Sequence, residues 1–201
     1  MDRILVWDWP TRVGHWLMAL SFLIAYVTGE SEAWRLVHAM AGGALAAIVV
    51  FRLVWGVLGS RHARFASFVR GPAAAWRYLG GLARGRATHH TGHNPAGAWA
   101  ILALLGLALL TTLSGWLYYQ DMGGDWLESM HEATAGIMLG VVAVHLAGVL
   151  LGSLAHGENL AAAMLTGYKR GPAAEAIARS WAWLAWLLPG FALLGAWWLS
   201  R

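Results

Sequence analysis

Long apolar stretches restrict this chain to the folds of integral membrane proteins. Five of them approach the ~20 residues that a helix needs to cross a bilayer, and they cover residues 12–29, 36–59, 95–119, 131–155 and 180–199. Of the 201 residues, 59% are hydrophobic and 12% charged, and that charged share is about half of what a soluble domain carries. The sequence therefore predicts an all-α membrane protein. The last stretch contains Pro189, so an interfacial helix is the alternative to the span that we expect there.

Basic residues between these stretches predict the orientation in the membrane. If the spans alternate, eleven of the fourteen Lys and Arg residues fall on one side: Arg3, Arg12, Arg61, Arg64, Arg70, Arg77, Arg84, Arg86, Lys169, Arg170 and Arg179. The positive-inside rule makes that side cytoplasmic, so the amino terminus is expected inside and the carboxyl terminus outside. Because topology and anionic lipid account for the net charge of +4, nucleic-acid binding is not expected.

Four histidines lie inside or at the mouths of the apolar stretches: His15, His38, His131 and His145. An ionisable residue within a span is costly, so each is a candidate functional residue. His131 and His145 share one stretch, and their spacing places them roughly 21 Å apart and within about 40° of one helical face. In the predicted topology, His15 and His145 lie near the cytoplasmic side, and His38 and His131 near the outer side. The sequence predicts two histidine pairs in a bundle core.

The distance between the two pairs limits which cofactor they can hold. The four ligands of a structural zinc ion must converge on one point, which histidines so far apart cannot do. Two imidazoles at each of two depths suit haem, whose porphyrin supplies four equatorial nitrogens. Cysteine is absent, which excludes c-type haem attachment and thiolate-bound clusters. Haem propionates need positive partners, and Arg12, Arg35 and Arg52 lie at matching depths; snorkelling to the interface is the alternative for the first two.

Three other groups of residues have two interpretations each. Small residues after the histidines, such as Gly42, Gly43 and Gly136, accommodate either a flat macrocycle or a closely packed helix. His62, His89, His90 and His93 lie in the expected cytoplasmic loop and His156 at the inner end of the fourth stretch. His89, His90 and His93 form either a metal site or, as we expect, part of a solvated basic loop. The outer acidic residues are either a solvated rim or a docking face for a cationic periplasmic protein: Asp121, Asp125 and Glu128.

Several short motifs follow one another in a specific order. They are Trp7-Asp8-Trp9-Pro10-Thr11-Arg12 before His15-Trp16, His38 in the second stretch, Arg52-Leu53-Val54-Trp55-Gly56, His93-Asn94-Pro95-Ala96-Gly97 before the third stretch, and His131-Glu132 with His145 in the fourth. Over residues 3–170 this order resembles the prokaryotic di-haem cytochrome b561 family, which is related to the b-type cytochrome subunits of nickel–iron hydrogenases and formate dehydrogenases.

The resemblance implies a four-helix membrane bundle with two non-covalent b haems, ligated by His15 with His145 and by His38 with His131. It implies a di-haem domain over residues 1–170, and residues 171–201 would add a fifth transmembrane helix. It also implies a bacterial inner-membrane protein that uses quinone as a substrate, with a homodimer as one option.

Haems with both axial positions occupied do not readily bind oxygen or substrate at iron, which predicts electron transfer. We expect transfer between the quinone pool and a periplasmic redox partner, such as a c-type cytochrome or a dehydrogenase subunit; whether the chain is itself an enzyme stays open. One alternative is a superoxide:ubiquinone oxidoreductase, which the acidic outer rim disfavours because superoxide is an anion. The other is a haem-free transporter of protons or metal.

Overall fold

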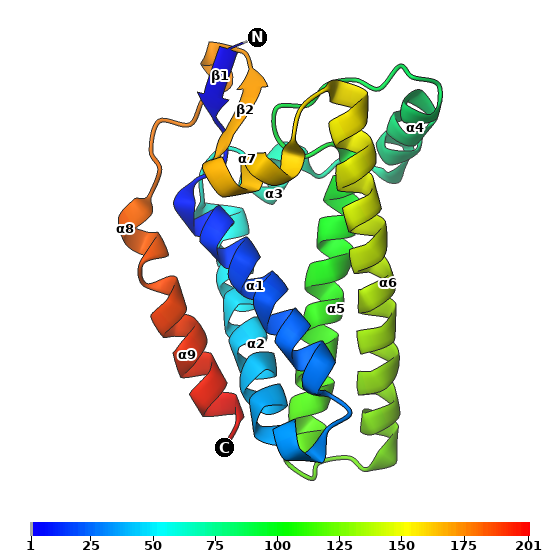
Figure 1. Cartoon of the computed structure of the whole chain (residues 1–201), viewed down its shortest axis with the longest axis vertical. Helices are drawn as coiled ribbons and strands as arrows, with labels where there is room; N and C mark the ends of the chain where they lie inside the picture. The colour runs from blue at the N-terminus through cyan, green and yellow to red at the C-terminus, as the bar shows by residue number, and fades with distance from the viewer. Residues whose placement is uncertain (1) are drawn as a thin grey trace.

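Four long helices form the body of the molecule, for which a computed structural model describes residues 2–201. They are α1 (Trp9–Thr28), α2 (Arg35–Leu58), α5 (Pro95–Tyr119) and α6 (Asp125–His156); a short 3-10 turn, Glu32–Trp34, precedes α2. Successive long helices run in opposite directions (Figure 1). α1 packs on α2, α2 on α5 and α5 on α6. The expected helical membrane bundle is confirmed.

The sequence fixes where two of these helices begin. Asp8 precedes α1, and its carboxylate accepts a hydrogen bond of 2.7 Å from the backbone N–H of Thr11. Asn94 precedes α5 and accepts one of 2.7 Å from the N–H of Gly97. In both cases a proline follows in the first turn, where its missing N–H costs nothing. The motif around Asp8 and the motif around Asn94 therefore each contain a helix cap.

Four helical segments are long and apolar enough to cross a membrane: Glu32–Leu58, Pro95–Tyr119, Asp125–His156 and Ala182–Leu199. The first predicted span coincides with α1, which has 20 residues and runs beside α2 (Figure 1). α1 is less apolar than the other four because Arg12 and His15 lie in its first half. It is nevertheless an integral part of the bundle.

The expected carboxyl-terminal span is present but interrupted. It consists of α8 (Ala182–Ala185) and α9 (Leu188–Leu199), with the break just before Pro189. α9 packs on α2 where Gly43 faces Gly195: a Cβ on Gly195 would lie 2.5 Å from the Cβ of Ala47 and 2.7 Å from the carbonyl oxygen of Gly43. At Gly43, therefore, the small residue permits a close helix contact.

Short elements gather at the end of the bundle where the chain begins (Figure 1). They are β1 (Asp2–Leu5), α3 (Phe65–Phe68), α4 (Pro72–Ala83), α7 (Leu160–Thr166), β2 (Tyr168–Gly171) and the 3-10 turn Ala173–Glu175. Most of the basic residues lie in or between them.

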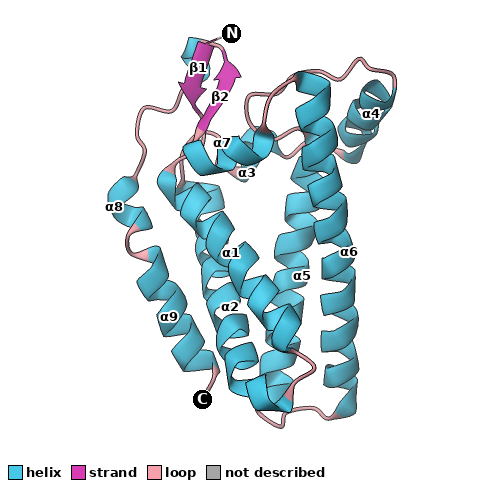
Figure 2. Cartoon of the chain, in the orientation of Figure 1, coloured by secondary structure: helices cyan, strands magenta, loops and turns pink. Residues whose placement is uncertain are grey.

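Two short strands, which the sequence did not indicate, accompany the helices. β1 pairs with β2 in antiparallel register, with Asp2 opposite Gly171 and Leu5 opposite Tyr168 (Figure 2). Each has four residues, too few for a clear alternating pattern, and their partnership spans most of the chain. β2 also crosses the boundary expected after residue 170, so the last segment is tied to the first.

Candidate functional site

His38 on α2 and His131 on α6 lie side by side near the end of the bundle opposite the strands. The predicted topology makes this the outer end of the bundle and the end near the strands the inner end. Their ring centroids are 5.8 Å apart, and the ring planes are inclined by 80°. Nδ1 of His38 lies 2.8 Å from the carbonyl oxygen of Ala25, and Nδ1 of His131 lies 2.9 Å from that of Thr111. Because a carbonyl only accepts, each Nδ1 carries the hydrogen and each Nε2 keeps its lone pair for a metal.

Two glycines lie against these rings. A Cβ on Gly115 of α5 would come within 2.6 Å of Nδ1 and 2.7 Å of Cε1 of His131. A Cβ on Gly29 would lie 3.5 Å from Cε1 of His38, an ordinary contact. The backbone of α5 at Gly115 therefore forms one wall of the outer histidine pair. Sequence reasoning missed this glycine, since a single glycine in an apolar helix gives no distinctive signal.

The inner histidines lie on two helices that do not pack closely against each other over the described residues. His15 comes from α1 and His145 from α6, at the end near the strands. They are close enough to interact electrostatically. Nδ1 of His15 is buried and has no hydrogen-bond partner. Buried polar atoms almost always have one, so this orphan nitrogen fits a group that binds between the helices.

Two of the three predicted arginines are buried at the inner end. Arg12 donates a hydrogen bond to the carbonyl of Leu165, and its guanidinium lies 4.1 Å from the ring centroid of Trp9. Arg52 is 5% exposed and donates through Nη2 to the carbonyl of Ala63 at 3.0 Å. Nε of Arg12 and Nη1 of Arg52 are buried without partners. Each buried guanidinium thus has a free donor, as binding of an anionic group requires.

Arg35 lies elsewhere. Its side chain is exposed, forms an ion pair of 3.6 Å with Glu32 and lies 5.3 Å from the ring centroid of Tyr119. The structure does not bring Arg35 into the interior beside the outer histidines. It matches the snorkelling alternative, in which an arginine near a helix end reaches the interface.

A buried acid links two of the motifs. Asp8 is 0% exposed, and besides capping α1 its Oδ2 accepts a hydrogen bond of 3.1 Å from Nε1 of Trp55. This contact joins the first motif to the Arg52–Gly56 motif and sets the inner end of α1 against α2. Sequence reasoning recognised both motifs but missed the contact between them.

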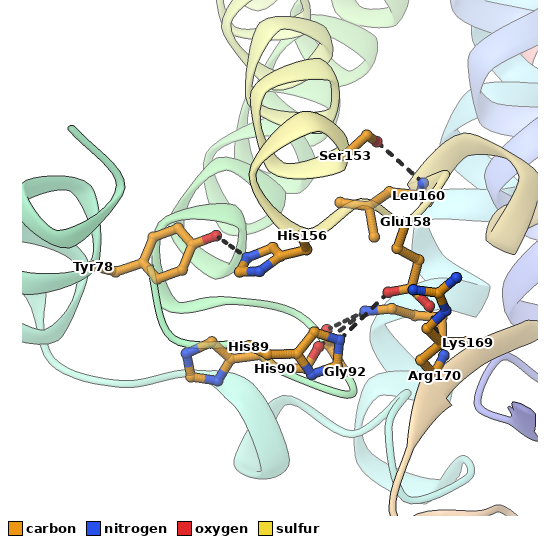
Figure 3. A network of polar contacts seen from close by, with 10 residues as sticks. All are labelled: Tyr78, His89, His90, Gly92, Ser153, His156, Glu158, Leu160, Lys169 and Arg170. Carbon is orange, nitrogen blue, oxygen red and sulfur yellow. Dashed lines mark hydrogen bonds and ion pairs between the residues drawn. The ribbon is translucent and has the colours of Figure 1, made fainter. Parts of the chain in front are cut away.

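Three other histidines at the inner end, His89, His90 and His156, lie near Glu158 and Lys169 (Figure 3). Glu158 pairs with Nε2 of His89 at 3.5 Å and accepts a hydrogen bond of 2.6 Å from the backbone N–H of Arg170. The ring of His156 lies edge-on to that of His89, with centroids 5.4 Å apart. No group of three or more potential ligands converges on a metal position within residues 2–201. The structure therefore offers no support for a metal site here.

Lys169 ties the strands to the loop before α5. Its side chain is buried, and Nζ donates to the carbonyl oxygens of His90 at 3.0 Å and Gly92 at 3.4 Å. Burial lowers the pKa of Lys169, against an opposing effect of Glu158. His93, the first residue of the motif before α5, has its ring between those of Trp7 and Phe68, with its centroid 4.5 Å from each.

Comparison with known proteins agrees with the motifs. Residues 6–167 match the model of the family described as prokaryotic cytochrome b561. Similar relatives come from Azotobacter chroococcum mcd 1 (27% identical, 63% of this chain and 65% of the relative), Escherichia coli K12 (25%, 58% and 60%) and Rhizobium leguminosarum bv. viciae (27%, 64% and 66%). All three are named probable Ni/Fe-hydrogenase B-type cytochrome subunits.

The chain spans less than two thirds of the length of these relatives. No solved structure shows a significant match. The family match includes all four histidines and both buried arginines, and it covers most of the chain. On that basis the chain belongs to the prokaryotic cytochrome b561 family, and membership of this family implies a b-type haem.

Proposed function

We propose that this chain carries electrons across the bacterial inner membrane through two b haems, one between His38 and His131 and one between His15 and His145. The geometry of the outer pair is the observation that carries the proposal. Two imidazole–metal bonds of about 2 Å each, plus the radii of the two rings, give centroids about 6 Å apart. The rings of His38 and His131 are 5.8 Å apart, and both Nδ1 atoms are engaged elsewhere.

Haem held in this way supplies one-electron transfer, with axial ligands, burial and nearby charge setting the potential. The protein's own residues keep the imidazoles in one tautomer at the outer site and surround the inner site with buried cations. Arg12 and Arg52 would bind haem propionates at the inner site. Arg35 would stay at the outer surface, where its side chain is exposed.

The partners follow from the charge distribution and from the relatives. The relatives' names connect them with hydrogenases, so a dehydrogenase subunit is one candidate for the outer redox partner and a c-type cytochrome another. Asp121, Asp125 and Glu128 lie exposed at the α5–α6 turn, where they would attract a cationic partner. Quinone is the proposed second substrate.

With the basic end cytoplasmic, the amino terminus lies inside. Residues 1–170 would form the haem-binding unit and α8–α9 an added helix, and a homodimer fits this arrangement.

Purification of the full chain in detergent tests the proposal. A Soret band with two haems per chain and reduction of both by a quinol analogue are expected. His145→Ala should remove the inner haem and spare the outer one, and His131→Ala should do the reverse. His156→Ala, at the end of the same helix, is the matched control and should keep both. Absence of a Soret band, or loss of only the outer haem in His145→Ala, would refute the proposal.

A further inference from the structure

Two buried nitrogen atoms at the inner end have no hydrogen-bond partner among residues 2–201. Nη1 of Arg52 and Nδ1 of His93 are both buried and lack a hydrogen-bond partner among the described residues. The Arg52 side chain is held by its bond to Ala63 and by the ring of Phe65, whose centroid is 4.9 Å from the guanidinium carbon. Both Arg52 and His93 are thus fixed in place, and each has an unused polar atom.

The charged groups that face His93 are cations or other histidines. Arg52 of α2 has the largest effect, followed by Lys169 of β2, His145 of α6 and His62 before α3. Together with burial, which is the largest cause, they hold the pKa of His93 well below its usual value. No carboxylate is among these groups, so the pocket is electropositive.

The nearest acids are engaged elsewhere. Asp8 faces Arg52, but its oxygens accept hydrogen bonds from the N–H of Thr11 and from Nε1 of Trp55. Within residues 2–201, Arg52 forms no ion pair. Glu158, which faces Lys169, is held by His89 and by the N–H of Arg170. Asp8 supplies a counter-charge to Arg52, but Nη1 of the guanidinium still has no acceptor among the described residues, and an external anion would provide one.

We propose that Arg52 and His93 form a binding site for one carboxylate, supplied by the haem that lies between His15 and His145. This inference rests on the proposed function and adds a residue and a ligand group to it. Arginine binds carboxylates through charge-assisted hydrogen bonds, and a neutral imidazole adds a second donor from the other side. Free phosphate has the same chemistry and is the competing source of the anion.

The site has a consequence that a purely structural histidine would not have. A bound carboxylate raises the pKa of His93 toward neutrality. If an electron reached the inner site, its negative charge would favour protonation of His93 from the inner aqueous side, with an upper limit of one proton for each electron. The inner midpoint potential should then fall with rising pH, by up to about 59 mV per tenfold change in proton concentration.

The experiment is a redox titration of both haems across neutral pH in the purified full chain. His93→Asn keeps a side-chain donor but cannot be protonated, and we expect at least a two-fold smaller pH slope at the inner haem, with the outer haem unchanged. His62→Asn is the matched control, because the Nε2 of His62 already has a partner, the carbonyl oxygen of Glu175 at 2.8 Å. It should leave the slope as it is.

A second measurement needs no substitution. The wild-type chain reconstituted with haem dimethyl ester, which has no free carboxylate, should lose the slope as His93→Asn does. Three results would overturn the assignment to a haem carboxylate. The first is an unchanged pH slope of the inner midpoint potential in His93→Asn or in the dimethyl ester protein. The others are an equal loss of that slope in His62→Asn and a slope that depends on phosphate concentration. A protein with two haems and an unaltered slope would refute this inference alone, whereas a protein without a Soret band would refute the proposed function itself.

Discussion

Gly115→Ala is expected to weaken the outer histidine pair while leaving the fold intact. The new Cβ would lie 2.6 Å from Nδ1 and 2.7 Å from Cε1 of His131, whereas non-bonded atoms prefer separations of about 3.5–4.0 Å. The imidazole ring must therefore move by about 1 Å. Such a movement would stretch the 2.9 Å contact between Nδ1 and the carbonyl of Thr111 beyond hydrogen-bond range.

The expected loss of haem affinity in Gly115→Ala follows from the lost contact between Nδ1 of His131 and the carbonyl oxygen of Thr111. A typical net hydrogen bond contributes about 1 kcal/mol, and loss of the partner that orients a metal-bound histidine reduces metal affinity about 10–100-fold. At about 1.4 kcal/mol per factor of ten, this range corresponds to about 1.4–2.8 kcal/mol. Alanine has a higher helix propensity than glycine by about 1 kcal/mol. Destabilisation of α5 therefore cannot account for a loss of haem.

The assay follows transfer of haem from the purified chain to an excess of apomyoglobin, with one phase for each haem. Gly115→Ala should accelerate one phase about 10–100-fold and leave the other unchanged. Gly106→Ala lies on the same helix and has no atom within 4 Å of its added Cβ, while Gly29→Ala contacts His38 at an ordinary 3.5 Å. Both should behave like the wild type. Unchanged kinetics in Gly115→Ala, or equal acceleration in Gly106→Ala, would refute the reasoning.

Three further outcomes can be measured on the same preparation. Asp8→Ala removes the cap of α1 and the acceptor of Trp55 and should lower the free energy of unfolding by about 1–3 kcal/mol, as denaturant titration would show; an unchanged midpoint would contradict this. Gly195→Ala should expose residues 172–201 to protease, because its Cβ would lie 2.7 Å from the Gly43 carbonyl oxygen, whereas Gly190→Ala, with open space around it, should not; equal protection in both would count against the α2–α9 contact. Burial holds the pKa of His62 and of His90 below the ordinary histidine value of 6.5, so the unfolded state binds more protons in acid. Stability should fall as pH drops through 6.5 toward the folded values, by up to about 1.4 kcal/mol per pH unit per histidine; thermal unfolding that is constant from about pH 8 to about pH 5.5 would contradict this.

The parts of the structure that depend on helix periodicity and span order could be predicted from sequence. His38 and His131 lie on helices whose order along the chain fixes their depth, and the structure places their rings side by side. Their role as ligands stays a prediction. Arg35 lies three residues before His38, just as Arg12 lies three residues before His15. The side chain of Arg35 is nevertheless exposed and paired with Glu32. Spacing fixes the depth of a residue on a helix but not whether its side chain turns inward.

The parts that depend on contacts distant in sequence could not be predicted. β1 and β2 have four residues each and lie at opposite ends of the bundle's sequence, so no local pattern indicates their pairing. The burial of His93 depends on Trp7 and Phe68, which come from two different segments. The polar residues around His89 and His90 are typical of a solvated loop. Only the tertiary structure shows that Nζ of Lys169 donates a hydrogen bond to the carbonyl oxygen of His90 in this loop.

The two ends of the bundle therefore hold their histidines by different physical means. At the outer end, backbone carbonyls fix both imidazoles, and the backbone at Gly115 limits the space beside one of them. Backbone carbonyls do not titrate, so these acceptors keep the same charge at every pH. At the inner end, long-range contacts bring together side chains that carry or accept charge, and Arg12, Arg52 and His93 retain unused polar atoms. Substitutions at the outer end should consequently act through volume, as at Gly115, and those at the inner end through charge, as at Arg52.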